Sequence, residues 1–153
     1  MTRLGRPRWL ALAIFLFLPI FLIPDLWAFS LTENKMFSEG PYLFKMEVEV
    51  NGRGSPKKSP MRMTSLKVKI KNDRASSRSL TVKSIRAYLD PQIYQDIETK
   101  GYPITPAQWV TKYYRLPKGK QPLLGEQASI EIAFDTFIIR FNPRERKFQG
   151  PMN

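Results

Sequence analysis

The 153-residue chain contains no cysteine and no histidine. Their absence excludes disulfide bonds, thiolate and imidazole metal ligands, Ser-His-Asp triads and Cys-His nucleophilic pairs. A glycine-rich phosphate loop, a zinc-ligand spacing and a nucleophile elbow are also absent from the sequence. We therefore expect a domain without cofactor or metal that is not an enzyme and is held together by its apolar core alone.

Acidic residues are few, and the chain carries 25 Lys and Arg against 13 Asp and Glu, a formal charge of +12. Residues 31–153 alone hold 22 basic and 12 acidic residues, so the excess belongs to the folded part and favours acidic partners. Glu47 and Glu49 share one face of an expected strand, where they could serve as acid and base or hold a cation. We favour cross-strand ion pairs with lysines for both of them.

The N-terminal segment combines a basic start with a long apolar run. Residues 1–8 are predicted to be a cytoplasmic basic segment, and the run from Trp9 to Pro24 has sixteen residues without a charge. The nineteen residues from Trp9 to Trp27 would span roughly 28 Å as a helix, close to the hydrocarbon thickness of a bilayer. We predict a transmembrane anchor over residues 9–29, with these anchor residues: Arg3, Arg6 and Arg8 inside, Trp9 and Trp27 at the two interfaces, and Asp25 at the outer one.

A cleaved signal peptide is the alternative, because Ala28-Phe29-Ser30 offers the small residues that a signal peptidase needs. Both interpretations keep the arginines on the cytoplasmic side and export the domain that follows. The chain has no Asn-x-Ser/Thr acceptor, which favours a bacterial periplasm. The predicted location is the bacterial inner membrane, with a single pass, a cytoplasmic N-terminus and a periplasmic domain in contact with membrane lipid.

After a linker over residues 30–41, alternating apolar residues predict β-strands across residues 42–142. The first covers 42–50, with Phe44, Met46 and Val48 facing inward. Further strands are expected over 61–71, 80–89, 109–116, 128–134 and 137–141. Changes of phase predict bulges near Thr64-Ser65 and around Ser84. Residues 51–60 are expected to be a mobile surface loop, and residues 143–153 a C-terminal tail.

One short helix is also predicted. Asp90 would be its N-cap, Pro91 its first residue and Gly101 its stop, with Ile93 and Ile97 one turn apart as its apolar contact. Because the strands show no βαβ rhythm, the pattern favours two packed sheets, a β-sandwich.

The stretch SLKVKIKNDRASSRSLTVKSIRAYLD, followed by GEQASIEIAFD, resembles the small immunoglobulin-like accessory domains of bacterial single-pass membrane proteins. In those domains a strand ends at an Asn, a polar turn follows, and a later strand is introduced by Gly and a polar residue. The resemblance implies an immunoglobulin-like β-sandwich and carries no catalytic residue with it. Together with the predicted anchor, the expected fold class is mainly β, an immunoglobulin-like β-sandwich preceded by one N-terminal transmembrane helix.

A basic face is the candidate docking site. Lys67, Lys69 and Lys71 face outward from one expected strand, and four further basic residues follow in the same hairpin: Arg74, Arg78, Lys83 and Arg86. If the two strands pair, one sheet surface carries a basic patch for an acidic lipid headgroup, an acidic protein or an acidic cell-wall polymer. The alternative is a solvated face whose lysines protect a sheet edge. Nucleic acid is not expected, because the domain is exported.

These observations lead to two hypotheses. The first is a non-catalytic, membrane-anchored accessory or assembly subunit of a larger membrane protein complex, which docks through its transmembrane helix and its basic exported domain. The alternative is a periplasmic binding module for an acidic ligand.

Overall fold

The computed structural model describes residues 27–55 and 58–153, in which eleven strands form two antiparallel sheets and no helix occurs. We call residues 27–153 the β-domain. The strands are β1 (Ala28–Glu39), β2 (Tyr42–Ser55), β3 (Lys58–Asn72), β4 (Leu80–Tyr88), β5 (Tyr94–Glu98), β6 (Tyr102–Ile104), β7 (Trp109–Arg115), β8 (Leu123–Leu124), β9 (Ser129–Phe134), β10 (Ile138–Asn142) and β11 (Lys147–Met152).

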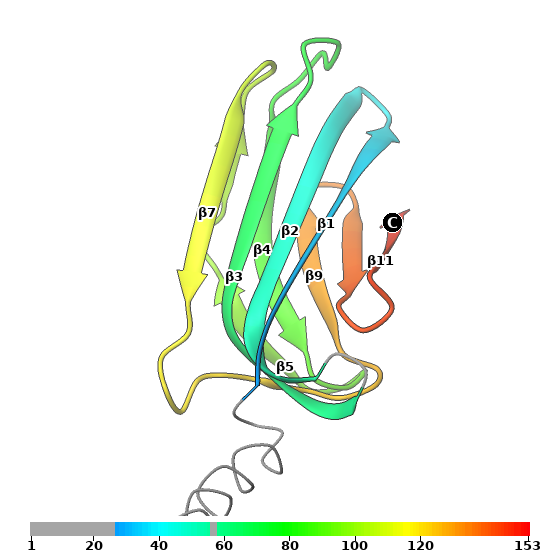
Figure 1. Ribbon diagram of the computed structural model, residues 1–153. Coiled ribbons are helices and arrows are strands. Elements are labelled where there is room, and N and C mark those ends of the chain that lie inside the picture. Colours follow the sequence, from blue (N-terminus) through cyan, green and yellow to red (C-terminus); the bar gives the residue numbers. More distant parts are fainter. Residues whose placement is uncertain (1–26, 56–57) are drawn as a thin grey trace, which may run out of the picture.

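The first sheet has the order β1-β2-β3-β7, with β8 also paired to β3. The second has the order β11-β10-β9-β4-β5, with β6 also paired to β4. Figure 1 shows the long strands of the first sheet lying over the second. The mainly β prediction is confirmed for the described residues.

One apolar cluster fills the space between the sheets, because each long strand alternates between buried and exposed side chains. Phe44 on β2 contacts Phe134 of β9 and Phe137 of the turn between β9 and β10, with ring centroids 5.5 and 5.8 Å from its own. The predicted inward residues Met46, Val48 and their neighbours on β3 are fully buried. This core takes the place of the cross-links that a chain without cysteine cannot form.

Both predicted bulges are confirmed. Opposite Asn51 and Gly52, the β3 register passes from Ser65 to Met63 and leaves Thr64 as the extra residue. Opposite Phe134 and Ala133, β4 passes from Val82 to Ser84 and leaves Lys83 as the extra residue. An extra residue reverses the in-and-out phase of a strand, which explains the changes in the sequence pattern.

The predicted linker over residues 30–41 is wrong, because β1 begins at Ala28 and pairs with β2 along its whole length. Leu31 and Phe37 point into the core, but Glu33 and Lys35 lie between them on the same side of the strand. Glu33 is satisfied there by Arg146, whose Nε lies 2.6 Å from Glu33 Oε1. Because polar residues occupy inner positions of this edge strand, its sequence lacks the alternation of apolar and polar residues that predicts a strand.

The predicted loop over 51–60 and the predicted tail over 143–153 are also wrong. β2 continues to Ser55 and β3 begins at Lys58, so the hairpin extends through most of the glycine-rich stretch. β11 pairs with β10, and Phe148 packs on Phe141 with centroids 4.9 Å apart. The extended part of the hairpin and β11 are held by pairing with neighbouring strands. Their own sequences have no alternating pattern that would predict a strand.

No helix begins at Asp90 among the described residues. Asp90 Oδ1 instead accepts hydrogen bonds from the backbone N–H of Gln92 and Ile93, at 2.7 and 2.9 Å, and closes the turn between β4 and β5. The same acceptor chemistry serves an N-cap and an Asx turn, so the sequence signal was ambiguous. Ile93 is 56% exposed and makes no apolar helix contact.

β3 and β4 do not pair, since they belong to different sheets. The chain crosses between the sheets at residues 73–79, where the buried Asn72 donates through Nδ2 to the carbonyl oxygens of Arg78 and Ile104. Ser76 Oγ donates to the carbonyl oxygen of Leu43 and accepts from its N–H. These bonds hold the crossing segment against β2.

The predicted anchor over residues 9–29 lies outside the described residues except for its outer end. That end is wrong, because Ala28 and Phe29 belong to β1 and pair with Arg53 and Gly52 of β2. Residues 27–55 and 58–153 contain no helix that is long and apolar enough to cross a membrane.

Candidate docking surface

The outer face of the first sheet brings the predicted lysines into rows with residues of β2 and β7. Across the sheet, Lys71 lies between Lys45 and Trp109, Lys69 between Glu47 and Thr111, and Lys67 between Glu49 and Tyr113. The order of the three strands therefore decides which lysine meets an acid and which does not.

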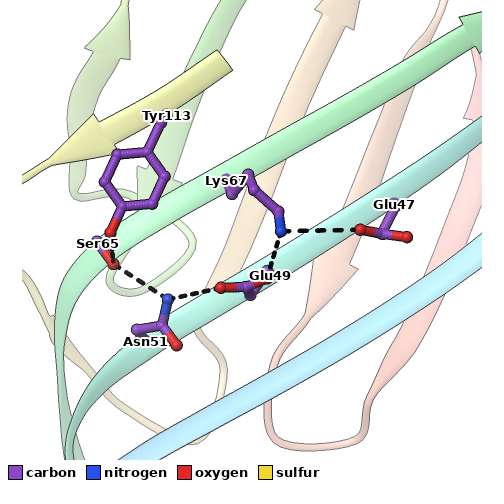
Figure 2. A network of polar contacts seen from close by, with 6 residues as sticks. All are labelled: Glu47, Glu49, Asn51, Ser65, Lys67 and Tyr113. Carbon is purple, nitrogen blue, oxygen red and sulfur yellow. Dashed lines mark hydrogen bonds and ion pairs between the residues drawn. The ribbon is translucent and has the colours of Figure 1, made fainter. Parts of the chain in front are cut away.

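Lys67 is bound within the sheet (Figure 2). Its Nζ lies 2.6 Å from Glu49 Oε2 and 4.0 Å from Glu47 Oε1. Asn51 Nδ2 donates to Glu49 Oε1 at 3.0 Å and to Ser65 Oγ at 3.2 Å, and the Tyr113 hydroxyl lies 3.4 Å from the same Ser65 oxygen. The favoured interpretation of Glu47 and Glu49 as cross-strand partners of lysine is confirmed.

These contacts change the acid–base properties of the pair. The hydrogen bond from Lys67, followed by that from Asn51, holds the pKa of the Glu49 carboxyl below its usual value. The hydrogen bond to Glu49 raises the pKa of Lys67. Both groups stay charged over a wider pH range than when isolated, and each is the ion-pair partner of the other.

Lys69 and Lys71 are arranged differently, because they lie over the ring of Trp109. Their Nζ atoms are 4.2 and 5.0 Å from the ring centroid. The ring remains 48% exposed, and Lys45 is the direct cross-strand partner of Lys71. We call Lys45, Lys69, Lys71 and Trp109 the lysine–tryptophan patch. Among the described residues, none of its three lysines has an ion pair.

The remaining predicted docking residues are not on this face. Arg74 and Arg78 lie in the segment that crosses between the sheets. Lys83 and Arg86 are on β4 in the second sheet, where they pair with Asp135 at 3.5 Å and with Asp96 at 2.9 Å. The single basic patch expected from pairing of β3 and β4 therefore does not form.

Two members of the patch were missed from the sequence. Lys45 faces outward in the alternation of residues 42–50, which was a usable signal, but its neighbour on the sheet could not be known. Trp109 gives no such signal, because large aromatic side chains are usually buried. Its position on the outer face follows from the pairing of Trp109 with Lys71.

On the outer face of the second sheet, two arginines form ion pairs with acids of the same sheet. Arg140 donates through Nε to Glu131 Oε2 at 3.1 Å, and Arg86 pairs with Asp96 while lying 4.5 Å from the Tyr94 ring centroid. A cleft of about 240 Å³ lies beside Arg140 and Tyr88, but its arginine is already engaged by the buried Glu131. In the part of the chain that the structure describes, no cluster of acidic residues could hold a metal ion.

Comparison with known proteins found no matching family model, no matching curated protein and no matching solved structure. The immunoglobulin-like resemblance stays a prediction, and the function is argued from the geometry of the outer faces.

Proposed function

We propose that this chain is a non-catalytic, membrane-anchored accessory or assembly subunit, whose β-domain docks on an acidic surface of a larger membrane protein complex through the lysine–tryptophan patch. The predicted anchor, shortened at its outer end by β1, would hold the subunit beside that complex, and the β-domain would be an immunoglobulin-like sandwich on the periplasmic side.

The direct opposition of Lys45 and Lys71 carries this proposal. Like charges that face each other across two strands destabilise a sheet, by roughly 0.2 to 1 kcal/mol. One row further along, Lys69 is opposite Glu47, and the next row pairs Lys67 with Glu49. The same two strands thus satisfy one lysine with acids and leave two others facing each other, an arrangement that an acidic partner would stabilise.

Trp109 adds the apolar part of a docking site. Tryptophan is enriched among the residues that dominate binding energy at protein interfaces, where a rigid ring is buried by the partner. Here nearly half of the ring is exposed, and the cations over it would face carboxylates of the partner. Such charge complementarity raises the association rate and selects among partners.

The test is co-purification of the full-length chain from membranes in a mild detergent. The K69E/K71E variant is expected to lose the co-purifying complex. The R78E/K83E variant, which reverses the same number of charges away from the patch, is expected to retain it. Retention by K69E/K71E, or purification of the wild-type chain alone, contradicts the proposal.

The binding-module alternative uses the same patch with a different partner. It predicts that the purified chain binds an acidic polymer without any co-purifying protein, and that binding weakens steeply as salt is added. The two interpretations therefore separate on whether a protein complex or a polymer is lost when Lys69 and Lys71 are reversed.

A further inference from the structure

The absence of a linker places one end of the β-domain close to the predicted anchor. The apolar run ends at Pro24, and three residues later the carbonyl oxygen of Trp27 accepts a 2.7 Å hydrogen bond from the N–H of Gly54. Three residues of extended chain span at most about 10 Å. A domain tied so closely to a bilayer cannot turn away from it, so the end that contains Trp27 would face the lipid.

Exposed apolar side chains gather at this end. β1 begins at this end of the molecule, where the turn from β4 to β5 and the segment that joins β7 to β9 also lie (Figure 1). Trp27 is 54% exposed, Ile93 56% and Leu123 43%. Leu123 pairs with Arg62 on β3, and Gln95 Nε2 donates to the carbonyl oxygen of Lys120, which connects the loop to β5.

Basic side chains are also found at this end, on β2, β3, β7 and the segment after β7. They are exposed and, among the described residues, have no ion pair: Arg53, Arg62, Arg115, Lys118 and Lys120. Two acids lie nearby, Glu126 in the loop and Asp90, whose carboxylate already closes the β4–β5 turn. Tryptophan with basic residues around it is the composition that favours the headgroup region of an anionic bilayer.

A cleft at this end has the lining that a phosphate needs. It has a volume of about 350 Å³ and is lined by Arg53 and Arg115, with Ala28, Thr64 and Ser65 beside them. The Thr64 hydroxyl already donates to the carbonyl oxygen of Asn51, so the two guanidinium groups are the donors left for a phosphate. Guanidinium groups donate paired hydrogen bonds to phosphate oxygens. The nearest acid in the adjacent network, Glu49, is bound by Lys67 and Asn51.

We propose that the Trp27 end of the β-domain is a lipid-binding surface that lies on the membrane and takes the phosphate of an anionic phospholipid headgroup in the cleft lined by Arg53 and Arg115. The inference rests on the retained anchor of the proposed function but concerns a different surface from the lysine–tryptophan patch. It assigns the two ends of the first sheet to two partners, lipid at the Trp27 end and an acidic protein at the patch.

The test uses single cysteines, which require no background changes because the chain has none. The full-length L123C and I93C variants, and the control S38C at the β1–β2 turn of the opposite end, receive a nitroxide label and are reconstituted into vesicles. One set contains phosphatidylcholine with phosphatidylglycerol, and the other contains phosphatidylcholine alone. Accessibility of the label to a water-soluble nickel relaxant and to oxygen reports its contact with lipid.

In anionic vesicles the labels at 93 and 123 are expected to be several-fold less accessible to nickel than the label at 38. This difference between the two ends is expected to be smaller in neutral vesicles. R53Q/R115Q in the labelled chain should remove the difference between the two lipids. R74Q/R78Q, which alters two equally exposed arginines at the other end, should keep it.

Three results would overturn the inference: equal nickel accessibility at 123 and 38, the same accessibility in both lipids, or spin–spin broadening that shows a second copy against this end. Vesicle flotation distinguishes this failure from failure of the proposed function. A chain that does not float with the vesicles after an alkaline wash has no retained anchor, whereas a chain that floats with a water-exposed position 123 refutes only the lipid surface.

Discussion

Lys45 and Lys71 are direct cross-strand partners on the outer face of the first sheet, with the exposed ring of Trp109 on the other side of Lys71. Two positive charges are thus held together, although acids are available on the next rows of the same strands. Such a like-charge pair is unfavourable for the stability of the domain by itself.

Removing one of these two charges should therefore stabilise the domain. K45Q, which leaves the contacts of Lys69 and Lys71 with the Trp109 ring unchanged, is expected to raise the free energy of unfolding by about 0.3 kcal/mol at low salt, with the gain shrinking as salt screens the repulsion. Thermal unfolding of the chain in detergent, followed by near-ultraviolet circular dichroism, measures it. K69Q is the matched control, since Lys69 is opposite Glu47 and its neutralisation should bring no gain. A gain of equal size in K69Q would count against repulsion as the cause.

The Lys67–Glu49 pair predicts a pH dependence of stability. Because the folded-state pKa of Glu49 is lowered, its contribution is present above the usual value of 4.5 and is lost as the pH falls through the folded-state pKa. E49Q should cost about 0.5 kcal/mol at neutral pH, and the difference from wild type should shrink in acid. E47Q should cost less, because Glu47 Oε1 lies 4.0 Å from Lys67 Nζ. Equal costs at both pH values would show that charge pairing is not the cause.

Tyr102 should ionise late. Burial raises its pKa from 10.0 to about 12, and burial likewise raises the pKa of the neighbouring Tyr114. The unfolded chain then loses the Tyr102 proton first, so stability falls as the pH rises above the unfolded value. In an ultraviolet titration of tyrosinate, Y102F should lack a step near pH 12 that the wild-type chain shows. A missing step near the ordinary tyrosine value would contradict the buried environment.

Gly101 should not tolerate a side chain. Its φ is +70°, and an added Cβ would collide with the carbonyl oxygen of Val82 at the β4–β6 pairing. G101A is expected to lower the free energy of unfolding by more than about 3 kcal/mol. Gly119, at φ +87° with nothing within 4 Å of an added Cβ, provides the control. G119A should cost about 1 kcal/mol, from backbone strain alone. Similar costs for the two variants would refute the collision.

The structure predictable from the sequence was that of strands with one buried face. Alternation from Phe44 to Val50 and from Leu66 to Ile70 correctly identified the inward residues, and interruptions of that alternation identified the bulges at Thr64 and Lys83. These are local properties, because successive side chains of a strand point to opposite faces whatever its partner is.

The edge strands β1 and β11 were not predictable in the same way. Glu33 and Lys35 lie on the inner side of β1, where Arg146 of the turn before β11 meets Glu33 across more than a hundred residues of sequence. Asp90 fits the sequence pattern of a helix N-cap, but its carboxylate closes the turn between β4 and β5. In both cases a contact distant in the sequence, or a second use of the same hydrogen-bond acceptor, decided the outcome.

By itself, the sequence determined that the chain folds without disulfide bonds, that its core is built from β-strands, which residues of those strands are buried, and that its net charge is positive. Only the tertiary structure decided how that basic charge is distributed. Placing β3 and β4 in different sheets separated Lys67, Lys69 and Lys71 from Lys83 and Arg86, and placing β2 and β7 beside β3 gave Lys67 two acids and Lys71 a lysine and a tryptophan. Alternation fixes the face on which a side chain lies, whereas its neighbours on that face depend on which strands pair, and pairing is set by the packing of the whole chain.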